Sequence, residues 1–372
     1  MEILTMNTAS TSYDTIKHLP SIVTVPSNMT NLANITRVSH NSSNSLSSSL
    51  PNSLSVPVNA NIQPDVISYY SETSEDYRGW SKSYHMHFGY FRFNGWGHFI
   101  KNIWRLEPQL NQASEEVFQK LAVKEGGHYL DMGCGYGATA RLFAKQYPKS
   151  KLTGISLVAS QVQEAQSLLK AESPNSINKV DFKKMDYQDT AFADESFDGV
   201  YAMESACHGR GEGRGEFLAE AFRLLKPNGT LVVHDAFTSK LHKKELHKTT
   251  GLNFIYNWAY HWLCKGWAVE DYINKEAFEA ELVRQGFQEI HFKNAFWNVL
   301  PSALHMPRII LTYFLQKMLF SKDFYRNKGL RKQRINHCLG SFSAMIVALH
   351  VRRFNYYVVT ARKGNNQKGI SS

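Results

Sequence analysis

The sequence predicts an α/β fold: a seven-stranded, mostly parallel sheet with an antiparallel last strand and helices on both faces. Between about 128 and 235, short apolar strands alternate with amphipathic helices, a pattern typical of parallel βαβ units. A glycine-rich turn follows the first of these strands. Near the end of the chain, two strand-like stretches lack a short crossover helix, which predicts an antiparallel pair that closes the sheet.

The expected elements follow the hydrophobic periodicity. Strands are expected at 128–132, 151–156, 180–185, 197–203, 230–234, 287–292 and 355–362. Helices are expected at 115–122, 138–146, 160–171, 214–225 and 276–285, with Ser114 as the N-cap of the first. A long, apolar and mostly helical insertion separates the last two strands.

Composition divides the chain into six parts. These are a disordered Ser/Asn/Thr-rich tail (1–64), an aromatic-rich N-terminal lid with helices (65–120), the α/β core (121–294), an apolar and basic helical insertion that caps the substrate (295–352), the last core strand (353–364) and a disordered end (365–372). The first tail is too polar to offset the entropy of ordering.

Charge and cysteine content restrict the class of protein. The net charge of +10 comes without a zinc-finger, RRM or KH signature, so a nucleic-acid partner is not expected. The basic excess serves either an anionic membrane surface or solubility. The four cysteines form no CxxC pair, which suits a reducing compartment. We therefore expect a cytoplasmic protein, with peripheral membrane contact as an open alternative; the oligomeric state is not predicted.

The turn after the first strand predicts a nucleotide-like cofactor. Asp131 precedes Gly133, Gly135 and Gly137, whose missing side chains let backbone N–H groups approach a ligand. A dinucleotide site would need an acidic residue at the end of the second strand, and Ser156 stands there instead. S-adenosyl-L-methionine (SAM) is therefore favoured.

Two acidic side chains suit the two ends of SAM. Asp131 is placed to face the ammonium group of the methionine moiety. Asp186 follows the third strand, where its carboxylate can accept a hydrogen bond from the adenine amino group.

The segment from about 128 to 235 resembles class I SAM-dependent methyltransferases. The run from Glu204 to His208, together with Tyr69, Tyr70 and Trp80, resembles the sterol 24-C-methyltransferase and tocopherol methyltransferase branch. The resemblance implies a Rossmann-like enzyme that uses SAM. It implies cofactor contacts at Asp131, Gly133, Cys134, Gly135, Gly137, Asp186 and Tyr187, with Ser156 and Gln161 sharing the role of the absent ribose acid.

Glu204 and His208 are the candidate catalytic residues, because they follow the fourth strand at the carboxyl edge of the sheet. With a carbon nucleophile, Glu204 would stabilise a carbocation or remove its proton; with oxygen or nitrogen, His208 would be the base. The structural alternative is that Glu204 caps a helix or pairs with Arg210.

Other polar and aromatic residues lie near the expected site. Tyr69, Tyr70 and Trp80 are expected to form a lid over SAM and substrate. The lid also contains His85 and His87, but no third ligand is spaced for a metal, and none is expected. His234 and Asp235 end the fifth strand, where they either face the substrate or make structural hydrogen bonds.

The predicted function is methyl transfer from SAM to a lipophilic small molecule, sterol- or prenyl-lipid-like, with carbon as a candidate acceptor atom. The aromatic content of 13% favours either a large core or an aromatic pocket. Two alternatives stay open: an O- or N-methyltransferase of a polar natural product, and a non-catalytic SAM-fold protein that binds membranes.

Overall fold

The structure is a computed structural model that describes residues 62–172, 174–176, 179–246, 251–320 and 332–365. Its strands are β1 (His128–Met132), β2 (Lys151–Ser156), β3 (Val180–Lys184), β4 (Phe197–Met203), β5 (Leu225–Thr238), β6 (Ile273–Asn274), β7 (Phe287–Asn294) and β8 (Phe354–Lys363). Its helices are α1 (Ile62–Trp80), α2 (Trp96–Asn102), α3 (Leu106–Leu121), α4 (Ala138–Gln146), α5 (Ala159–Glu172), α6 (Gly215–Leu224), α7 (Lys240–Glu245), α8 (Leu252–Gly266), α9 (Lys275–Arg284), α10 (Phe296–Ala303), α11 (Met306–Phe320) and α13 (Lys332–Ala348).

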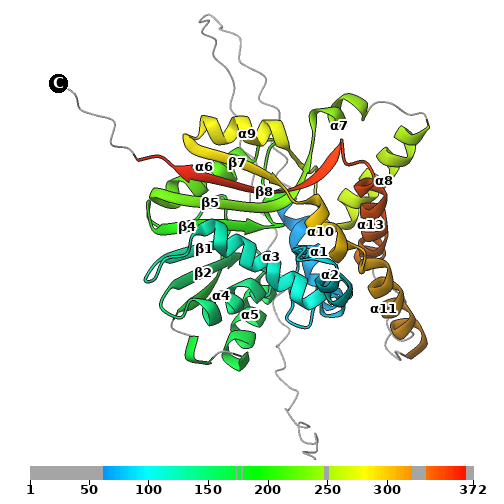
Figure 1. Ribbon diagram of the computed structural model, residues 1–372, viewed down its shortest axis with the longest axis horizontal. Helices are drawn as coiled ribbons and strands as arrows, with labels where there is room; N and C mark the ends of the chain where they lie inside the picture. The colour runs from blue at the N-terminus through cyan, green and yellow to red at the C-terminus, as the bar shows by residue number, and fades with distance from the viewer. Residues whose placement is uncertain (1–61, 173, 177–178, 247–250, 321–331, 366–372) are drawn as a thin grey trace, which may run out of the picture. The chain divides into compact units, whose positions relative to one another are not determined.

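One sheet organises the described residues, with the strand order β3-β2-β1-β4-β5-β8-β7 (Figure 1). The strands from β1 to β5 pair in parallel, and β8 is antiparallel to both β5 and β7. The predicted sheet is therefore confirmed, and the two-residue β6, which pairs with β5, is an addition to it. The order reverses between β1 and β4, where ligands of open α/β sheets bind beyond the carboxyl ends of the strands.

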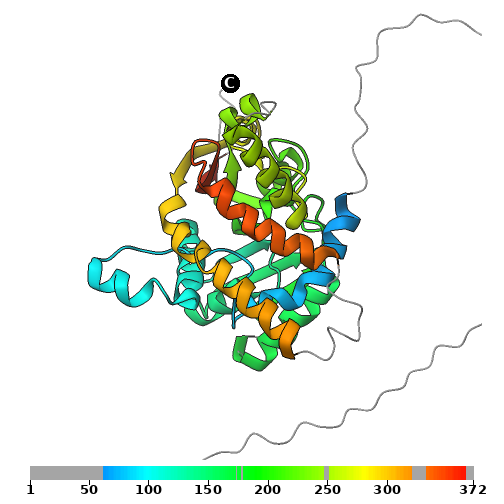
Figure 2. The same cartoon turned by 90° about the vertical axis from the view of Figure 1, so that its right-hand side faces the viewer.

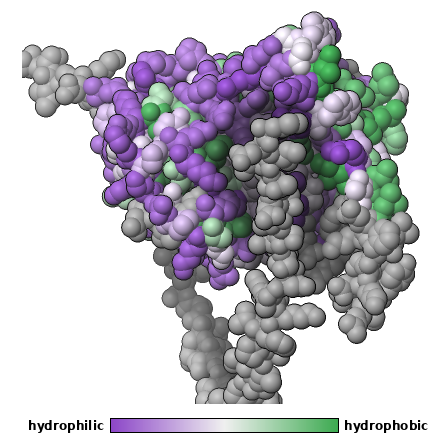
Figure 3. Space-filling model, turned by 60° about the horizontal axis from the view of Figure 1, so that its bottom comes forward, coloured by the Kyte–Doolittle hydropathy of each residue, from purple (hydrophilic) through white to green (hydrophobic). Residues whose placement is uncertain are grey.

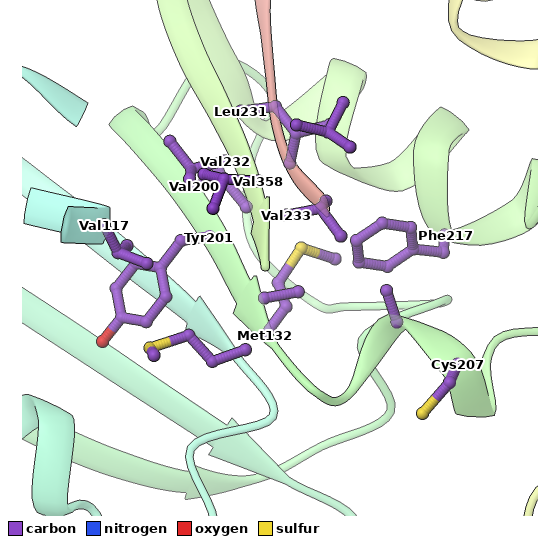
Figure 4. Packing of buried hydrophobic residues seen from close by; sticks show 14 of the residues in the cluster. Val117, Met132, Val200, Tyr201, Cys207, Phe217, Leu231, Val232, Val233 and Val358 are labelled. Carbon is purple, nitrogen blue, oxygen red and sulfur yellow. The ribbon is translucent and has the colours of Figure 1, made fainter. Parts of the chain in front are cut away.

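The central strands are buried on both faces, which explains their continuous apolar sequence. Val200 in β4 and Val232 and Val233 in β5 are completely buried. Figure 4 shows Val117 of α3 and Phe217 of α6 on either side of these strands. This rigid layer positions the turns that follow β1 and β4.

The helix expected at 115–122 is longer than predicted. It begins at Leu106, so the prediction that Ser114 caps it is wrong. Ser114 is buried in the middle of α3, and its hydroxyl lies 3.0 Å from that of Thr139 in α4. The apolar spacing of Leu110, Ala113 and Val117 extends across the polar residues that suggested a helix start.

The predicted tails lie almost entirely outside the described residues. Residues 62–64, assigned to the first tail, instead begin α1. The boundaries of the other parts stay a proposal.

The insertion between β7 and β8 contains α10, α11 and α13. Helix α13 packs along α8 and also contacts α1 and α11 (Figures 1 and 2). Two glycines allow the close approach: a Cβ on Gly340 would lie 2.7 Å from the Cα of Gly266. No described helix is both long and apolar enough to cross a membrane.

Candidate active site

Two cavities adjoin at the carboxyl ends of the parallel strands. The smaller contains about 820 Å³ of space and the larger about 1040 Å³, each partly open to solvent. Four residues line both cavities: Tyr70, Met86, Glu204 and His208. The two predicted catalytic side chains therefore lie in the wall that the cavities share.

The glycine turn forms one side of the smaller cavity. Gly133 and Gly135 line it, with φ values of +121° and +49° that L side chains rarely adopt. A Cβ on Gly133 would lie 2.3 Å from the Cβ of Ser205, and a Cβ on Gly135 would lie 2.5 Å from the Sδ of Met86. The turn therefore leaves a cradle of backbone that any side chain would fill.

The end of β2 supplies neutral polar groups to the same cavity. The hydroxyl of Ser156 donates to Oε1 of Gln161 at 2.8 Å, and both residues line the cavity. Neither carries a charge, so the place that the sequence assigns to ribose is polar but not acidic.

The segment after β3 completes the smaller cavity. Tyr187 lines it and donates its hydroxyl to the carbonyl of Ser205 at 2.8 Å. Asp186 lies beside it, where Oδ1 accepts from the N–H of Gln188 at 2.9 Å and Oδ2 pairs with Arg210 at 3.4 Å. Arg210 also pairs with Glu216. Its ion pairs are therefore with Asp186 and Glu216, and not with Glu204 as one predicted alternative had it.

Five predicted site residues line neither cavity, and Asp186 is one of them. Asp131 is buried in β1 and accepts a hydrogen bond from the Tyr201 hydroxyl at 2.8 Å; burial raises its pKa to about 7. Cys134 and Gly137 belong to the glycine turn but line neither cavity, and neither does the buried Tyr69. Contact of these residues with the cofactor stays a prediction, because they lie outside the lining of both cavities.

Glu204 stands at the centre of the site with an uncommon backbone conformation. Its φ of +49° lies in the left-handed region, which is uncommon for non-glycine residues. Its Oε1 accepts from the N–H of Phe88 at 2.7 Å and from the Tyr356 hydroxyl at 2.6 Å. Burial raises its pKa to about 8, although both hydrogen bonds oppose the rise. Glu204 is therefore poised to gain or lose a proton near neutral pH.

Tyr356 connects Glu204 to the fifth strand. Its hydroxyl also lies 2.9 Å from Nδ1 of His234, and burial lowers the pKa of His234 to about 3. Asp235 accepts from the N–H groups of Cys207 and Ala236. His234 and Asp235 thus make the structural hydrogen bonds that were one of the two expectations, and Asp235 also lines the larger cavity.

His208 faces the lid. Its Nε2 lies 3.0 Å from the Tyr70 hydroxyl, and the two rings meet edge to face. Burial, and next the charge of Arg214, lower the pKa of His208 to about 4. The ring is therefore neutral at pH 7.

The larger cavity is mostly aromatic and aliphatic. Residues of the lid, the sheet edge and the insertion line it: Trp80, Phe88, Val269, Trp267, Tyr272, Met306, Ile309 and Ile310. Tyr356, Trp267 and Met86 are not among the predicted site residues. Tyr356 lies in a strand that the sequence predicts. Its closeness to Glu204 depends on the strand register, which pairs Tyr356 with Ala236 of β5.

The lid histidines form a hydrogen-bonded pair. Nδ1 of His85 lies 3.0 Å from Nε2 of His87, and burial lowers the pKa of both rings. Across the described part of the chain, no group of three or more His, Cys, Asp or Glu side chains is arranged to hold a metal ion.

The smaller cavity fits a nucleoside that carries a short zwitterionic chain. The glycine cradle approaches it with bare backbone at the N-terminus of α4, and Ser156 and Gln161 provide neutral hydrogen-bonding groups for hydroxyls. Asp186 directly precedes the cavity-lining Tyr187 but does not itself line the cavity, so its contact with the adenine amino group stays a prediction. The residues present therefore fit SAM.

Comparison with known proteins defines the class. Residues 130–233 match the methyltransferase domain family. The chain is 28% identical to erythromycin 3''-O-methyltransferase of Saccharopolyspora erythraea over 68% of its own length and 79% of that protein. It is 32% identical to sterol 24-C-methyltransferase ERG6A of Gibberella zeae, over 45% of its own length but only 40% of that protein.

Solved structures show the same fold. Mycolic acid cyclopropane synthase CmaA1, complexed with S-adenosylhomocysteine (SAH) and CTAB, superposes with a TM-score of 0.64 at 18% identity, covering 81% of this chain and 98% of the other. Geranyl diphosphate C-methyltransferase from Streptomyces coelicolor superposes with a TM-score of 0.56 at 13% identity, covering 82% and 99%.

Fold, glycine cradle and domain match together define an α/β enzyme that binds SAM. The methyltransferase domain at residues 130–233, together with relatives that are named methyltransferases, indicates a class I SAM-dependent methyltransferase with SAM as its cofactor.

Proposed function

We propose that this methyltransferase transfers the methyl group of SAM to a carbon atom of a lipophilic small molecule, sterol- or prenyl-lipid-like. The shared wall carries the proposal: Glu204 borders both the cofactor cavity and a large cavity lined by aromatic and aliphatic side chains. An apolar acceptor would fill the larger cavity and meet the cofactor at Glu204.

The chain's own residues support such a reaction. When bound, SAM supplies an electrophilic methyl group and a positive sulfonium charge. A positive charge in the neighbouring cavity favours the ionised form of Glu204, which would then stabilise a developing cation and accept its proton. Aromatic faces at Tyr70, Trp80 and Trp267 exclude water and suit a cation.

Two relatives act on related kinds of molecule, which supports the proposal. The sterol 24-C-methyltransferase and the geranyl diphosphate C-methyltransferase named above are, by their names, carbon methyltransferases of a sterol and of a prenyl diphosphate. Peripheral membrane contact is part of the proposal. Phe254 and Trp258 of α8, Leu311 of α11 and Phe342 of α13 are exposed. Figure 3 shows hydrophobic surface at the right, the side on which Figure 1 draws these helices. A cytoplasmic location stays a prediction.

O-Methylation is the second candidate, because the relative that aligns over 79% of its length is an O-methyltransferase. In that reaction His208, neutral at pH 7, would act as the base. In a non-catalytic protein, Glu204 would only link Phe88 of the lid to Tyr356 of the last strand. Its place in the wall between the two cavities supports a chemical role instead.

Calorimetry and labelling test the proposal. SAM and SAH are expected to bind in the micromolar range and NADH not to bind. Incubation with methyl-labelled SAM and a cellular lipid extract is then expected to give a labelled lipid whose methyl group is carbon-bound by mass spectrometry. A label released by ester or ether cleavage would favour O-methylation, and no label in the lipid fraction would refute the lipophilic acceptor.

A further inference from the structure

The polar side chains that line the larger cavity include two groups on different elements. One group stands on the sheet edge and the adjoining turn: Glu204, His208, Asp235 and Tyr356. The other stands on helices that cover the cavity, with Asp76 in α1 and His337 in α13. Methyl transfer as proposed above uses only the first group.

Asp76 and His337 are nearly buried, and each has one polar atom without a hydrogen bond among the described residues. Oδ2 of Asp76 lies 3.3 Å from Nδ1 of His337, and Oδ1 lies 3.5 Å from Nε of Arg334. The three side chains are exposed by only 12%, 16% and 18%. Neither contact has hydrogen-bond geometry, so Oδ1 of Asp76 and Nδ1 of His337 are buried without a hydrogen-bond partner among the described residues.

Apolar and aromatic groups surround this polar pair. The rings of Tyr69 and Tyr77 lie 5.8 and 5.4 Å from that of His337. A buried polar atom without a hydrogen-bond partner is unfavourable, and most buried polar atoms in native proteins are hydrogen-bonded. Asp76 and His337 both line the larger cavity, so a ligand in that cavity would meet their side chains.

We propose that Asp76 and His337 form a subsite that binds a neutral hydroxyl group of the lipophilic acceptor. A hydroxyl is both a donor and an acceptor, so it can donate to the Asp76 carboxylate and accept from the His337 ring. An anionic head group would meet the negative charge of Asp76. This inference rests on the proposed function, and it adds that the acceptor is an alcohol held by the helical wall while its reacting carbon lies at Glu204.

The competing explanation is that Asp76 only ties the lid to the cap. Arg334 binds both Asp76 and the carbonyl of Glu72, so it links α13 to α1. Arg334 does not line the cavity, however, whereas Asp76 does. The variant Arg334→Gln therefore weakens the link and keeps the subsite, which makes it a matched control for Asp76→Leu.

Three probes of one chain length separate these explanations: farnesol, the hydrocarbon farnesene and farnesyl diphosphate. Binding to the full chain saturated with SAH is followed by quenching of tryptophan fluorescence, because Trp80 and Trp267 line the cavity. We expect the wild type to bind farnesol about tenfold more tightly than farnesene, as one or two net hydrogen bonds would give. In Asp76→Leu the preference is expected to vanish while farnesene still binds; in Arg334→Gln it is expected to persist.

The possible failures differ from one another. Equal binding of farnesol and farnesene by the wild type, or tighter binding of farnesyl diphosphate, would overturn the hydroxyl subsite and leave the lipophilic acceptor standing. Loss of the preference in Arg334→Gln as well would reduce Asp76 to a structural link. No binding of any of the three probes, with SAH still bound, would overturn both the subsite and the proposed function. Unchanged SAH affinity and circular dichroism verify that each variant is folded.

Discussion

The cofactor cavity and the acceptor cavity are built in different ways. Most residues of the cofactor cavity come from four turns between 133 and 210, each at the end of a parallel strand. The acceptor cavity is assembled from positions between 70 and 356, on helices of the lid, the insertion and two antiparallel-paired strands. The first is thus a property of local sequence and the second of tertiary packing.

The two cavities meet at one wall, and that wall decides the chemistry. Glu204 belongs to the fourth turn of the cofactor side, yet its hydroxyl partner Tyr356 comes from the last strand. A variant that affects one cavity alone is therefore expected to leave binding to the other intact, whereas a variant at the shared wall is expected to affect turnover and leave binding largely unchanged.

The largest effect is expected for Glu204→Gln. Removal of the ionisable group removes the proposed base, and turnover in the lipid-labelling assay is expected to fall about 10²- to 10⁴-fold with SAH affinity within about twofold. Glu212→Gln, at an exposed pair with Lys243, is the control and is expected to be fully active. Near-normal labelling by Glu204→Gln would eliminate Glu204 from the chemistry.

On the cofactor side, Gly135→Ala is expected to weaken SAM binding about 10- to 100-fold. The new Cβ would clash with Met86 at 2.5 Å and requires a φ of +49°. Gly97→Ala is the matched control, because a Cβ there meets nothing within 4 Å. Calorimetry measures the loss. Equal weakening of farnesene binding would show that the two cavities are not independent.

The difference between the two cavities also explains which site residues the sequence could predict. The glycine turn, Ser156 and Glu204 were predictable because spacing relative to a strand end fixes their place in a parallel sheet. The role of Asp131 could not be judged, because the direction of its side chain depends on Tyr201 in another strand. Tyr356 and Asp76 were not found because a strand register and a helix packing, invisible in local pattern, bring them to the site.

On the acceptor side, Gly340→Ala is expected to destabilise the protein by about 1–3 kcal/mol, through overpacking of α13 against α8. The clash is with backbone, the Cα of Gly266 at 2.7 Å, so no side chain can rotate away. Leu339→Ala, on the exposed side of the same helix, is the control. Thermal melting measures the loss, and farnesene affinity is expected to fall with SAH affinity retained. A melting temperature equal to that of the control would mean that the two helices separate easily.

The smallest effect, and the most specific to the shared wall, is expected for Tyr356→Phe. Burial raises the pKa of Glu204 to about 8, and the hydrogen bond that the Tyr356 hydroxyl donates to the carboxylate opposes this rise. When the hydroxyl is removed, the carboxylate is less stabilised and the pKa of Glu204 rises further. A smaller fraction of Glu204 is then ionised at pH 7, so turnover that needs the carboxylate is expected to fall there by about three- to tenfold.

The pH profile separates this effect from a structural one. The rising limb of turnover is expected to move to higher pH in Tyr356→Phe, with the rate approaching that of the wild type above about pH 9, because the carboxyl is ionised again once the pH exceeds its pKa. Single-turnover rates from about pH 6 to about pH 9.5 locate this limb in both proteins. An equal loss at every pH would show that Tyr356 orients Glu204 or the acceptor without tuning its proton affinity.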